Sequence, residues 1–162
     1  MNTNVLQSLK DVGAIYEVID CDPSFADTAE FCDHYGYLSQ ESANAIVLEG
    51  KAEPSVFALC LVLATTRINV NKVARKRLGT RKASFAKAEI TKELTGMEIG
   101  GVTPFGLPEN LPIWIDDLVM TAPKVIIGAG SRNAKIYLSP EYLLKLPNSY
   151  VVEGLSMPLV TE

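Results

Sequence analysis

The spacing of apolar residues in the first half of the chain predicts two helices, a strand and a strand hairpin. Helical spacing over 5–12, closed by a glycine, predicts an amphipathic helix, and a β-rich alternation over 14–21 predicts a strand. An Asp or Thr caps a second helix over 29–36 that ends on a glycine. Two apolar runs, 45–48 and 56–63, predict strands that pair as a buried hairpin.

The second half of the chain predicts more strands than helices. A capping asparagine, terminal glycines and a Ser-Pro-Glu start predict helices over 69–79, 86–96 and 142–146. The predicted strands lie at 81–85, 111–115, 124–127, 135–138 and 150–152. Because strands often follow strands directly, we expect an α+β fold class with a mixed, curved, barrel-like sheet flanked by helices. Residues 157–162 are expected to form a frayed tail.

Composition indicates an ordinary soluble protein. The chain has 162 residues, of which 48% are hydrophobic and 21% charged, and this length fits one domain with a sizeable core. No apolar run approaches the roughly 18 residues that a membrane span requires. The first residues lack the basic and apolar regions of a secretory signal, so we expect a cytoplasmic protein. The three cysteines form no CxxC motif and are expected to be reduced and mostly buried.

The positive charges are concentrated in one short region of an acidic chain. The formal net charge of −4 argues against a protein that coats DNA through its overall field. More than half of the 15 Lys and Arg residues nevertheless lie between positions 71 and 92, where the only acid is Glu89. This region is a candidate phosphate-binding face or, alternatively, a solvated helix face. The candidate phosphate-contacting residues of this region are Lys72, Arg75, Lys76 and Arg81.

Several common chemistries lack the residues they need. His34 is the only histidine and lies in a polar helix, so a Ser-His-Asp or Cys-His triad is not expected. No spacing of Cys and His suits zinc, and the adjacent Asp116 and Asp117 would point to opposite faces of a strand. The Gly-Ala-Gly at 128–130 leads into a strand and not a helix, which argues against a nucleotide cofactor. We therefore expect no metal and no cofactor.

The stretch at 100–108 reads Gly-Gly-Val-Thr-Pro-Phe-Gly-Leu-Pro, between a predicted helix and a predicted strand. Glycine allows close approach and proline fixes the backbone, so the segment is expected to be a shaped, rigid loop. The free N–H groups of such a loop can point at a carbonyl or an anion. The alternative is a structural turn that only joins two elements.

Several stretches follow one another in an order and spacing that is typical of one family. They are Asp-Thr-Ala-Glu at 27–30, the basic helix at 71–79, Leu-Thr-Gly at 94–96, the glycine-proline run at 100–106, Leu-Pro-Ile-Trp-Ile-Asp at 111–116 and the glycine loop at 128–130. Together they resemble the YbaK-type family, also called prolyl-tRNA synthetase associated domains. The resemblance implies a single editing domain over 1–162, with a core of about 5–155 and a mixed α+β fold.

The resemblance also implies an activity. Members hydrolyse the ester bond of mischarged aminoacyl-tRNA without a metal or cofactor, so the implied partners are mischarged tRNA and an aminoacyl-tRNA synthetase. Lys72, Arg75, Lys76 and Arg81 are then the residues expected to contact the tRNA. The loop at 100–104 would hold the ester carbonyl, with Gly100 and Gly101 in the catalytic step. The other residues expected to bind substrate are Thr28, Val102, Thr103, Pro104, Asp116, Gly128, Gly130 and Ser131. For Thr28 the alternative role is helix capping.

Two positions depart from the family pattern. Family deacylases carry a lysine at the start of the strand where this chain has Asn44, and one bacterial branch carries an aspartate where this chain has Lys135. We hypothesise that Lys135 supplies the missing cation from the opposite wall and that Asn44 is a neutral hydrogen-bonding partner. The alternative is that Lys135 points to solvent.

The loss of the family lysine leaves other functions open. The chain would then be a non-catalytic module that binds aminoacyl-tRNA or a synthetase. A third class is a hydrolase of another small acyl ester, or a nucleotide binder.

Overall fold

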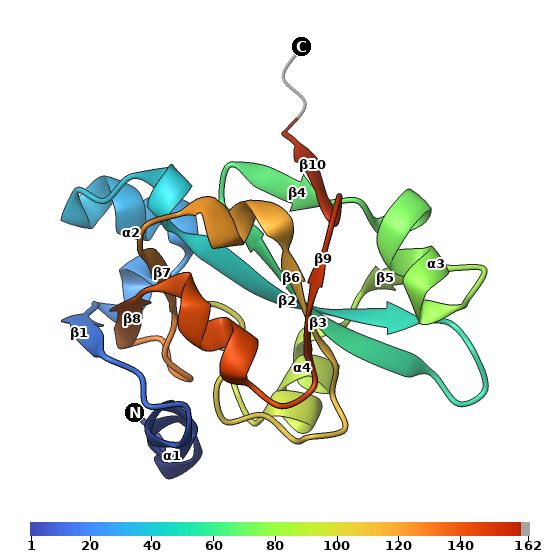
Figure 1. Ribbon diagram of the computed structural model, residues 1–162, viewed down its shortest axis with the longest axis horizontal. Coiled ribbons are helices and arrows are strands. Elements are labelled where there is room, and N and C mark those ends of the chain that lie inside the picture. Colours follow the sequence, from blue (N-terminus) through green and yellow to red (C-terminus); the bar gives the residue numbers. More distant parts are fainter. Residues whose placement is uncertain (160–162) are drawn as a thin grey trace.

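A five-stranded mixed sheet runs through the middle of the molecule (Figure 1). The computed structural model describes residues 1–159. The strand order of this sheet is β5 (Ala83–Phe85), β2 (Ala43–Gly50), β3 (Val56–Leu63), β6 (Ile113–Asp116) and β9 (Ser149–Val152). β2 and β3 are antiparallel, whereas β6 pairs in parallel with β3 and with β9. The predicted hairpin is confirmed.

The continuous apolar run of β3 is explained by burial on both faces. Alternate side chains of a strand point to opposite faces, so β3 contributes to two cores. Leu59, Leu61 and Leu63 enter the larger core beneath α1, while Cys60 and Val62 pack with Trp114 on the other side. Both faces of this sheet therefore carry helices or loops.

A second, antiparallel sheet has the order β1 (Tyr16–Asp20), β8 (Ala134–Leu138) and β7 (Val125–Gly128). An isolated bridge between Ser42 and Ile126 brings β7 beside the start of β2. A third sheet is the pair β4 (Thr66–Ile68) and β10 (Ser156–Pro158). The fold is thus mixed α+β, as predicted. Three separate sheets are formed in the described residues, and they do not close into a barrel.

Short helices connect the sheets. The α-helices are α1 (Thr3–Asp11), α2 (Thr28–Tyr35), α3 (Arg75–Leu78) and α4 (Ala88–Thr95). The 3₁₀ turns are η1 (Pro23–Phe25), η2 (Ser39–Glu41), η4 (Asp117–Thr121) and η5 (Pro140–Lys145), and η3 (Val70–Ala74) is a π-helical turn that leads into α3. Among residues 1–159, no helix is long and apolar enough to cross a membrane.

Two predictions about elements need correction, and one strand pair was missed. The predicted helix over 142–146 is the 3₁₀ turn η5, which begins at Pro140 and ends on Lys145. The strand pair β4–β10 was not predicted. Met157 and Pro158, expected in a frayed tail, belong to β10, whereas 160–162 lie outside the described residues.

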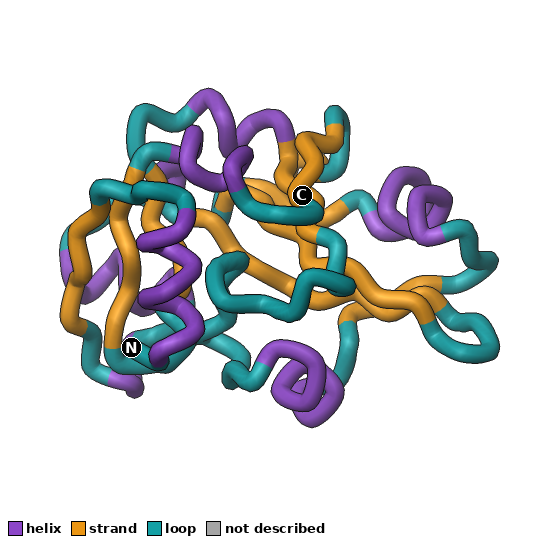
Figure 2. Tube along the Cα trace, turned by 60° about the horizontal axis from the view of Figure 1, so that its bottom comes forward, coloured by secondary structure: helices purple, strands orange, loops and turns teal. Residues whose placement is uncertain are grey.

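The two ends of the β2–β3 hairpin define two separate regions. In Figures 1 and 2 the hairpin extends away from α1 and the β1-β8-β7 sheet toward α3. The start of β2 therefore lies beside β7, and the end of β2 lies beside β5 and α3. The candidate site is at the first end, and most of the basic residues are at the second.

Candidate active site

Two glycine loops pack back to back at the start of β2. A Cβ on Gly101 would lie 2.6 Å from the backbone of Ser131, and a Cβ on Gly128 would overlap the carbonyl oxygen of Val102. The N–H of Gly130 donates to the carbonyl of Gly101 at 2.7 Å. Only glycine permits so close an approach of two backbones. The loop 100–104 is therefore shaped by its contact with the loop 128–131.

A pocket of about 360 Å³ opens beside these loops. Its walls come from the start of α2, the start of β2, the first glycine loop and β8. Six residues proposed from the sequence line it together: Thr28, Asn44, Gly100, Val102, Gly128 and Lys135. Asp27, Ile46, Ile99 and three alanines complete the lining. The structure therefore assembles polar groups from segments that lie up to about a hundred positions apart.

Lys135 reaches the pocket from β8. Its side chain is buried, with 7% of the residue exposed, and its Nζ donates to the carbonyls of Ala26 at 2.6 Å and Gly100 at 3.0 Å. Nζ also lies 5.7 Å from the ring centroid of Phe31. Burial lowers the pKa of the Lys135 ammonium from its ordinary value, and the nearby Arg132 lowers it further. The alternative that Lys135 points to solvent is wrong.

A hydrogen bond joins Thr28 to Asn44 across the pocket. The Thr28 hydroxyl donates to Oδ1 of Asn44, which ties the first turn of α2 to the start of β2. The residue at the N-cap of α2 is Asp27, and neither Asp27 nor Thr28 makes a side-chain capping bond there. Because Oδ1 of Asn44 is the acceptor, its amide N–H groups are not used in this bond.

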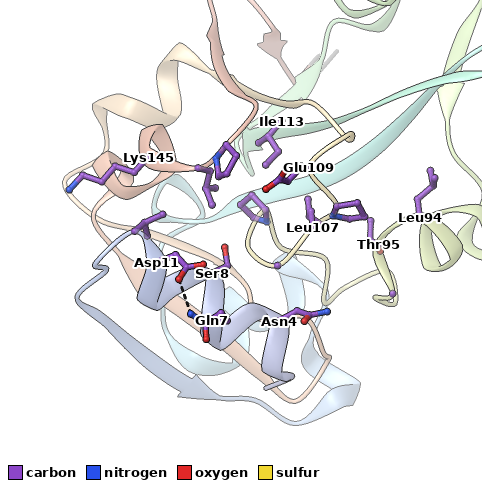
Figure 3. A pocket seen from close by; sticks show the side chains of 17 residues that line it. Asn4, Gln7, Ser8, Asp11, Leu94, Thr95, Leu107, Glu109, Ile113 and Lys145 are labelled. Atoms are coloured by element: carbon purple, nitrogen blue, oxygen red, sulfur yellow. Dashed lines mark hydrogen bonds between the residues drawn. The ribbon is translucent and has the colours of Figure 1, made fainter.

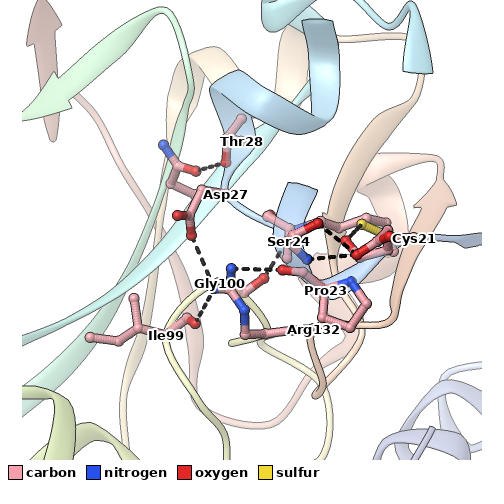
Figure 4. Close-up of polar contacts among 12 residues, drawn as sticks. Cys21, Pro23, Ser24, Asp27, Thr28, Ile99, Gly100 and Arg132 are labelled. Atoms are coloured by element: carbon pink, nitrogen blue, oxygen red, sulfur yellow. Dashed lines mark hydrogen bonds and ion pairs between the residues drawn. The ribbon is translucent and has the colours of Figure 1, made fainter. Parts of the chain in front are cut away.

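Arg132 fastens the rim of the pocket, as Figure 4 shows. Its guanidinium pairs with the Asp27 carboxylate at 3.1 Å and donates to the carbonyls of Ile99 and Pro23, both at 2.9 Å. The guanidinium also lies where a side chain on Gly100 would be, and Gly100 has φ +92°. Arg132 and Lys135 thus hold the segment before α2 and the first glycine loop at a fixed separation.

The backbone N–H groups of the first glycine loop differ in whether they have an acceptor within the protein. Gly101 donates its N–H to the carbonyl of Glu98 at 2.9 Å, and it faces the second loop and does not line the pocket. The N–H groups of Gly100 and Val102 find no acceptor within residues 1–159, and both residues line the pocket. Gly101, predicted as a catalytic residue, therefore packs against the second loop outside the pocket lining, whereas its two neighbours line the pocket.

Five other predicted site residues lie outside this pocket. Thr103 is fully buried and, in the described part of the chain, its hydroxyl has no partner. Gly130 packs against α1 and Ser131 bonds to Asn133. Pro104 lines a different groove of about 770 Å³ between α1 and the Lys145–Pro147 segment (Figure 3).

Asp116 has a structural role at the end of β6. It is fully buried and accepts hydrogen bonds from the N–H and the hydroxyl of Ser156, which attaches β10 to the central sheet. Burial raises the pKa of the Asp116 carboxyl. Asp116 is therefore not a wall of the pocket, contrary to the prediction.

The predicted tRNA-contacting residues are at the other end of the hairpin. Arg75 and Arg81 line a separate basic groove, whereas Lys72 and Lys76 do not. His34 stacks on Phe25 at 3.9 Å, outside the pocket. Within the described residues, no three His, Cys, Asp or Glu side chains gather as metal ligands would. The cysteines are free and buried, as predicted, and burial raises the pKa of the Cys60 thiol to about 12.

Sequence reasoning missed Asp27 and Arg132 as parts of the site. In the sequence Asp27 stands at the start of a predicted helix, and Arg132 stands at the end of a glycine loop. Their contact joins residues 105 positions apart. The one local signal was an arginine directly after a glycine loop, which is a common arrangement at surfaces.

A family model described as "Aminoacyl-tRNA editing domain" matches residues 22–146 of the chain. YwhH of Bacillus subtilis (strain 168), described as uncharacterized, is 27% identical over 135 residues, which are 83% of each chain. A protein of Enterococcus faecalis (strain ATCC 700802 / V583), named "Putative Cys-tRNA(Pro)/Cys-tRNA(Cys) deacylase EbsC", is 25% identical over 95 residues. That match covers 59% of this chain and 57% of EbsC.

Two solved structures share the fold over nearly their whole length. The crystal structure of hypothetical protein APE2540 has a TM-score of 0.83 at 23% identity, covering 95% of this chain and 99% of the other. The structure described as "a putative trans-editing enzyme for prolyl tRNA synthetase" has a TM-score of 0.78 at 25% identity. It covers 94% of this chain and 97% of the other.

Proposed function

The chain belongs to the aminoacyl-tRNA editing domain family, and we propose that it hydrolyses the ester bond of mischarged aminoacyl-tRNA in the cytoplasm. One observation carries the proposal. Gly100 and Val102, whose N–H groups have no acceptor within residues 1–159, and Lys135, whose ammonium is buried, line one pocket. Such a set of donors is what a developing oxyanion requires. The description of EbsC as a deacylase supports the same reaction class.

In this mechanism the ester carbonyl lies against the loop at 100–102. A water oxygen forms a bond to the carbonyl carbon, the ester C–O bond breaks, and one water proton ends on the departing ribose oxygen. The N–H groups of Gly100 and Val102 stabilise the charge that develops on the carbonyl oxygen, in a pocket that is already organised. No step uses a histidine or a metal ion.

Lys135 is proposed as the cation of the site. Two of its N–H groups are fixed by the carbonyls of Ala26 and Gly100, so the third is left to act on substrate. The bond from Nζ to the Gly100 carbonyl also joins this cation to the first glycine loop. Asn44, held by Thr28, offers amide N–H groups from the opposite wall as a neutral partner.

A second candidate is a module that binds aminoacyl-tRNA, or a synthetase, without hydrolysis. The observation that favours it is that Lys135 already donates to two backbone carbonyls, as a purely structural lysine would. A deacylase turns over many equivalents of substrate, whereas a binding module protects the charged tRNA. Multiple turnover therefore separates the two functions.

The experiment is deacylation of a panel of mischarged tRNAs by wild type and Lys135→Met. The panel begins with cysteinyl-, alanyl- and seryl-tRNA for proline. We expect hydrolysis of at least one species, with kcat reduced about 10²–10³-fold in Lys135→Met, as for loss of one oxyanion donor. The exposed Lys10→Met is the matched control and should retain wild-type turnover.

A charge swap tests whether Lys135 on β8 replaces the family lysine at position 44 on β2. Asn44→Lys combined with Lys135→Asp recreates the pattern of the family branch described above, so it should recover activity that Lys135→Asp alone lacks. Unchanged turnover in Lys135→Met would exclude a catalytic role for this lysine. No hydrolysis by wild type, together with retained binding of charged tRNA, would favour the binding module. Gly101→Val is unsuitable as a catalytic test, because its side chain would strike the Ser131 backbone.

A further inference from the structure

A basic groove lies at the far end of the β2–β3 hairpin. It has a volume of about 620 Å³ and is lined by Lys51, Arg75, Arg81 and Lys82 together with Asn71, Ala83 and Ser84. We call these four cations and their surroundings the basic groove. None of its lining residues is acidic, although the chain as a whole has a net charge of −4. A local positive surface on an acidic protein attracts a polyanion to that place alone.

The groove is built by backbone contacts between three segments. The N–H of Lys51 donates to the carbonyl of Lys82 at 2.8 Å, so the end of β2 and the start of β5 are joined. The Thr80 hydroxyl donates to the same carbonyl at 3.0 Å. These bonds fix the spacing of the cations, since each cationic side chain starts from a backbone that is held in place.

Arg75 is the most organised cation of the groove. Its Nε donates to the carbonyl of Asn71 at 3.0 Å and its Nη1 donates to the carbonyl of Thr80 at 2.9 Å. The remaining guanidinium N–H groups are left for a ligand, and an arginine held in this way loses little entropy when it binds an oxyanion. Arg81 and Lys82 are exposed and make no ion pair within residues 1–159. Lys51 pairs with Glu49 at 3.3 Å.

The distance between the groove and the pocket suits a nucleic acid. Asn44 and Lys51 are seven positions apart on an extended strand and its continuation, which corresponds to about 24 Å at roughly 3.4 Å per residue. At about 3.4 Å per stacked nucleotide, this is the length of about seven nucleotides. A tRNA whose 3′ end is in the pocket is therefore long enough for base-paired phosphates of its acceptor stem to reach the groove.

We propose that the basic groove binds backbone phosphates of the tRNA acceptor stem while the aminoacylated 3′ end occupies the pocket at Lys135. The inference rests on the proposed function for the identity of the RNA. Contacts of this kind position a nucleic acid and read no sequence, because lysine and arginine meet only phosphates. The groove residues differ from the predicted set: Lys51 and Lys82 belong to it, and Lys72 and Lys76 do not.

The test compares two double variants that change the net charge equally. Arg81→Glu/Lys82→Glu alters the groove, and Lys10→Glu/Lys145→Glu alters exposed lysines elsewhere. Binding of uncharged tRNA is followed by fluorescence anisotropy over a series of salt concentrations. The groove variant should bind at least about tenfold more weakly, with a slope of log K against log salt that is smaller by about 2. The control variant should keep the wild-type slope.

Kinetics give a second measurement. On full-length aminoacyl-tRNA the groove variant should raise KM and leave kcat unchanged, whereas an aminoacylated CCA trinucleotide should be hydrolysed as by wild type. Equal losses in the two charge variants, or wild-type affinity and slope in the groove variant, would overturn the inference. If wild type binds tRNA through the groove but hydrolyses no substrate, the deacylase proposal fails and the groove stands.

Discussion

Replacement of Arg132 by methionine should separate the stability of the site from its catalytic geometry. Arg132 is the tether between the segment before α2 and the first glycine loop, through Asp27, Pro23 and Ile99. Methionine keeps the unbranched aliphatic stem and removes all three polar contacts. The loop at 100–102 would then be held on this side by Lys135 alone.

The expected loss of stability follows from the three contacts. The ion pair to Asp27, whose side chain is 59% exposed, contributes at most about 1 kcal/mol. Each charged hydrogen bond to a backbone carbonyl contributes about 1 kcal/mol, because the Arg132 side chain is itself 27% exposed. The sum is about 2–3 kcal/mol, which for a domain of this size lowers Tm by roughly 4–12 °C.

The catalytic effect should exceed what this loss of stability explains. Below Tm nearly all of the variant is folded, so a lower kcat reports altered geometry of the Gly100 and Val102 N–H groups. A misplacement of about 1 Å costs about 100-fold in rate. Single-turnover deacylation at 20 °C, together with thermal and urea unfolding, measures both quantities on one preparation. Arg132→Lys should be intermediate, because an ammonium lacks the planar fork that reaches several acceptors.

Two results would refute this reasoning. A variant that loses stability but keeps the wild-type kcat would mean that Lys135 and the loop packing fix the N–H groups without Arg132. A variant with wild-type stability would mean that the tether is not formed in solution. Asp27→Asn is the matched control, since it keeps an oxygen acceptor for Arg132 and should retain most of the rate.

Three further outcomes are expected. Because burial lowers the Lys135 pKa and the cation is required, background-corrected deacylation should fall as pH rises through a value below that of an exposed lysine, and Lys135→Arg should lose this falling limb. Gly128→Ala should lower stability by about 1–3 kcal/mol and reduce activity in parallel, because its Cβ would overlap the Val102 carbonyl. Ser156→Ala should lower stability by about 2 kcal/mol in urea unfolding with kcat unchanged, because it leaves the buried Asp116 carboxylate short of a donor outside the pocket.

The long elements were predictable because their apolar runs and terminal glycines are local signals in the sequence. The apolar run over 56–63 predicted a strand of a buried hairpin, and glycine ended α2 and α4 where the structure has left-handed residues, Gly36 and Gly96. The β4–β10 pair was not predictable in the same way. Each strand has three residues, and the pairing joins positions far apart in the chain, such as Ile68 and Ser156.

The sequence located the glycine loop but not the direction of its groups. Adjacent glycines look alike in a sequence, yet Gly101 packs on the second loop while Gly100 carries a positive φ beneath Arg132. The N–H of Gly101 is taken by the nearby Glu98 carbonyl, and the carbonyl of Gly101 accepts from the N–H of Gly130, which only the fold brings close. Loop composition therefore predicted a site, and tertiary contacts determine which residues of the loop line the pocket.

The position of Lys135 determines what kind of chemistry the pocket offers. A lysine at the start of β2, where Asn44 stands, would lie at the pocket wall on a strand edge. Lys135 instead rises from β8, is buried, and is bonded to the carbonyls of Ala26 and Gly100. Two carbonyl acceptors favour the protonated form locally, while desolvation lowers the pKa. A cation held in this way is poorly suited to carry protons but well suited to stabilise charge from a fixed position, so the proposed hydrolysis depends on electrostatic stabilisation of the oxyanion and not on general base catalysis by this lysine.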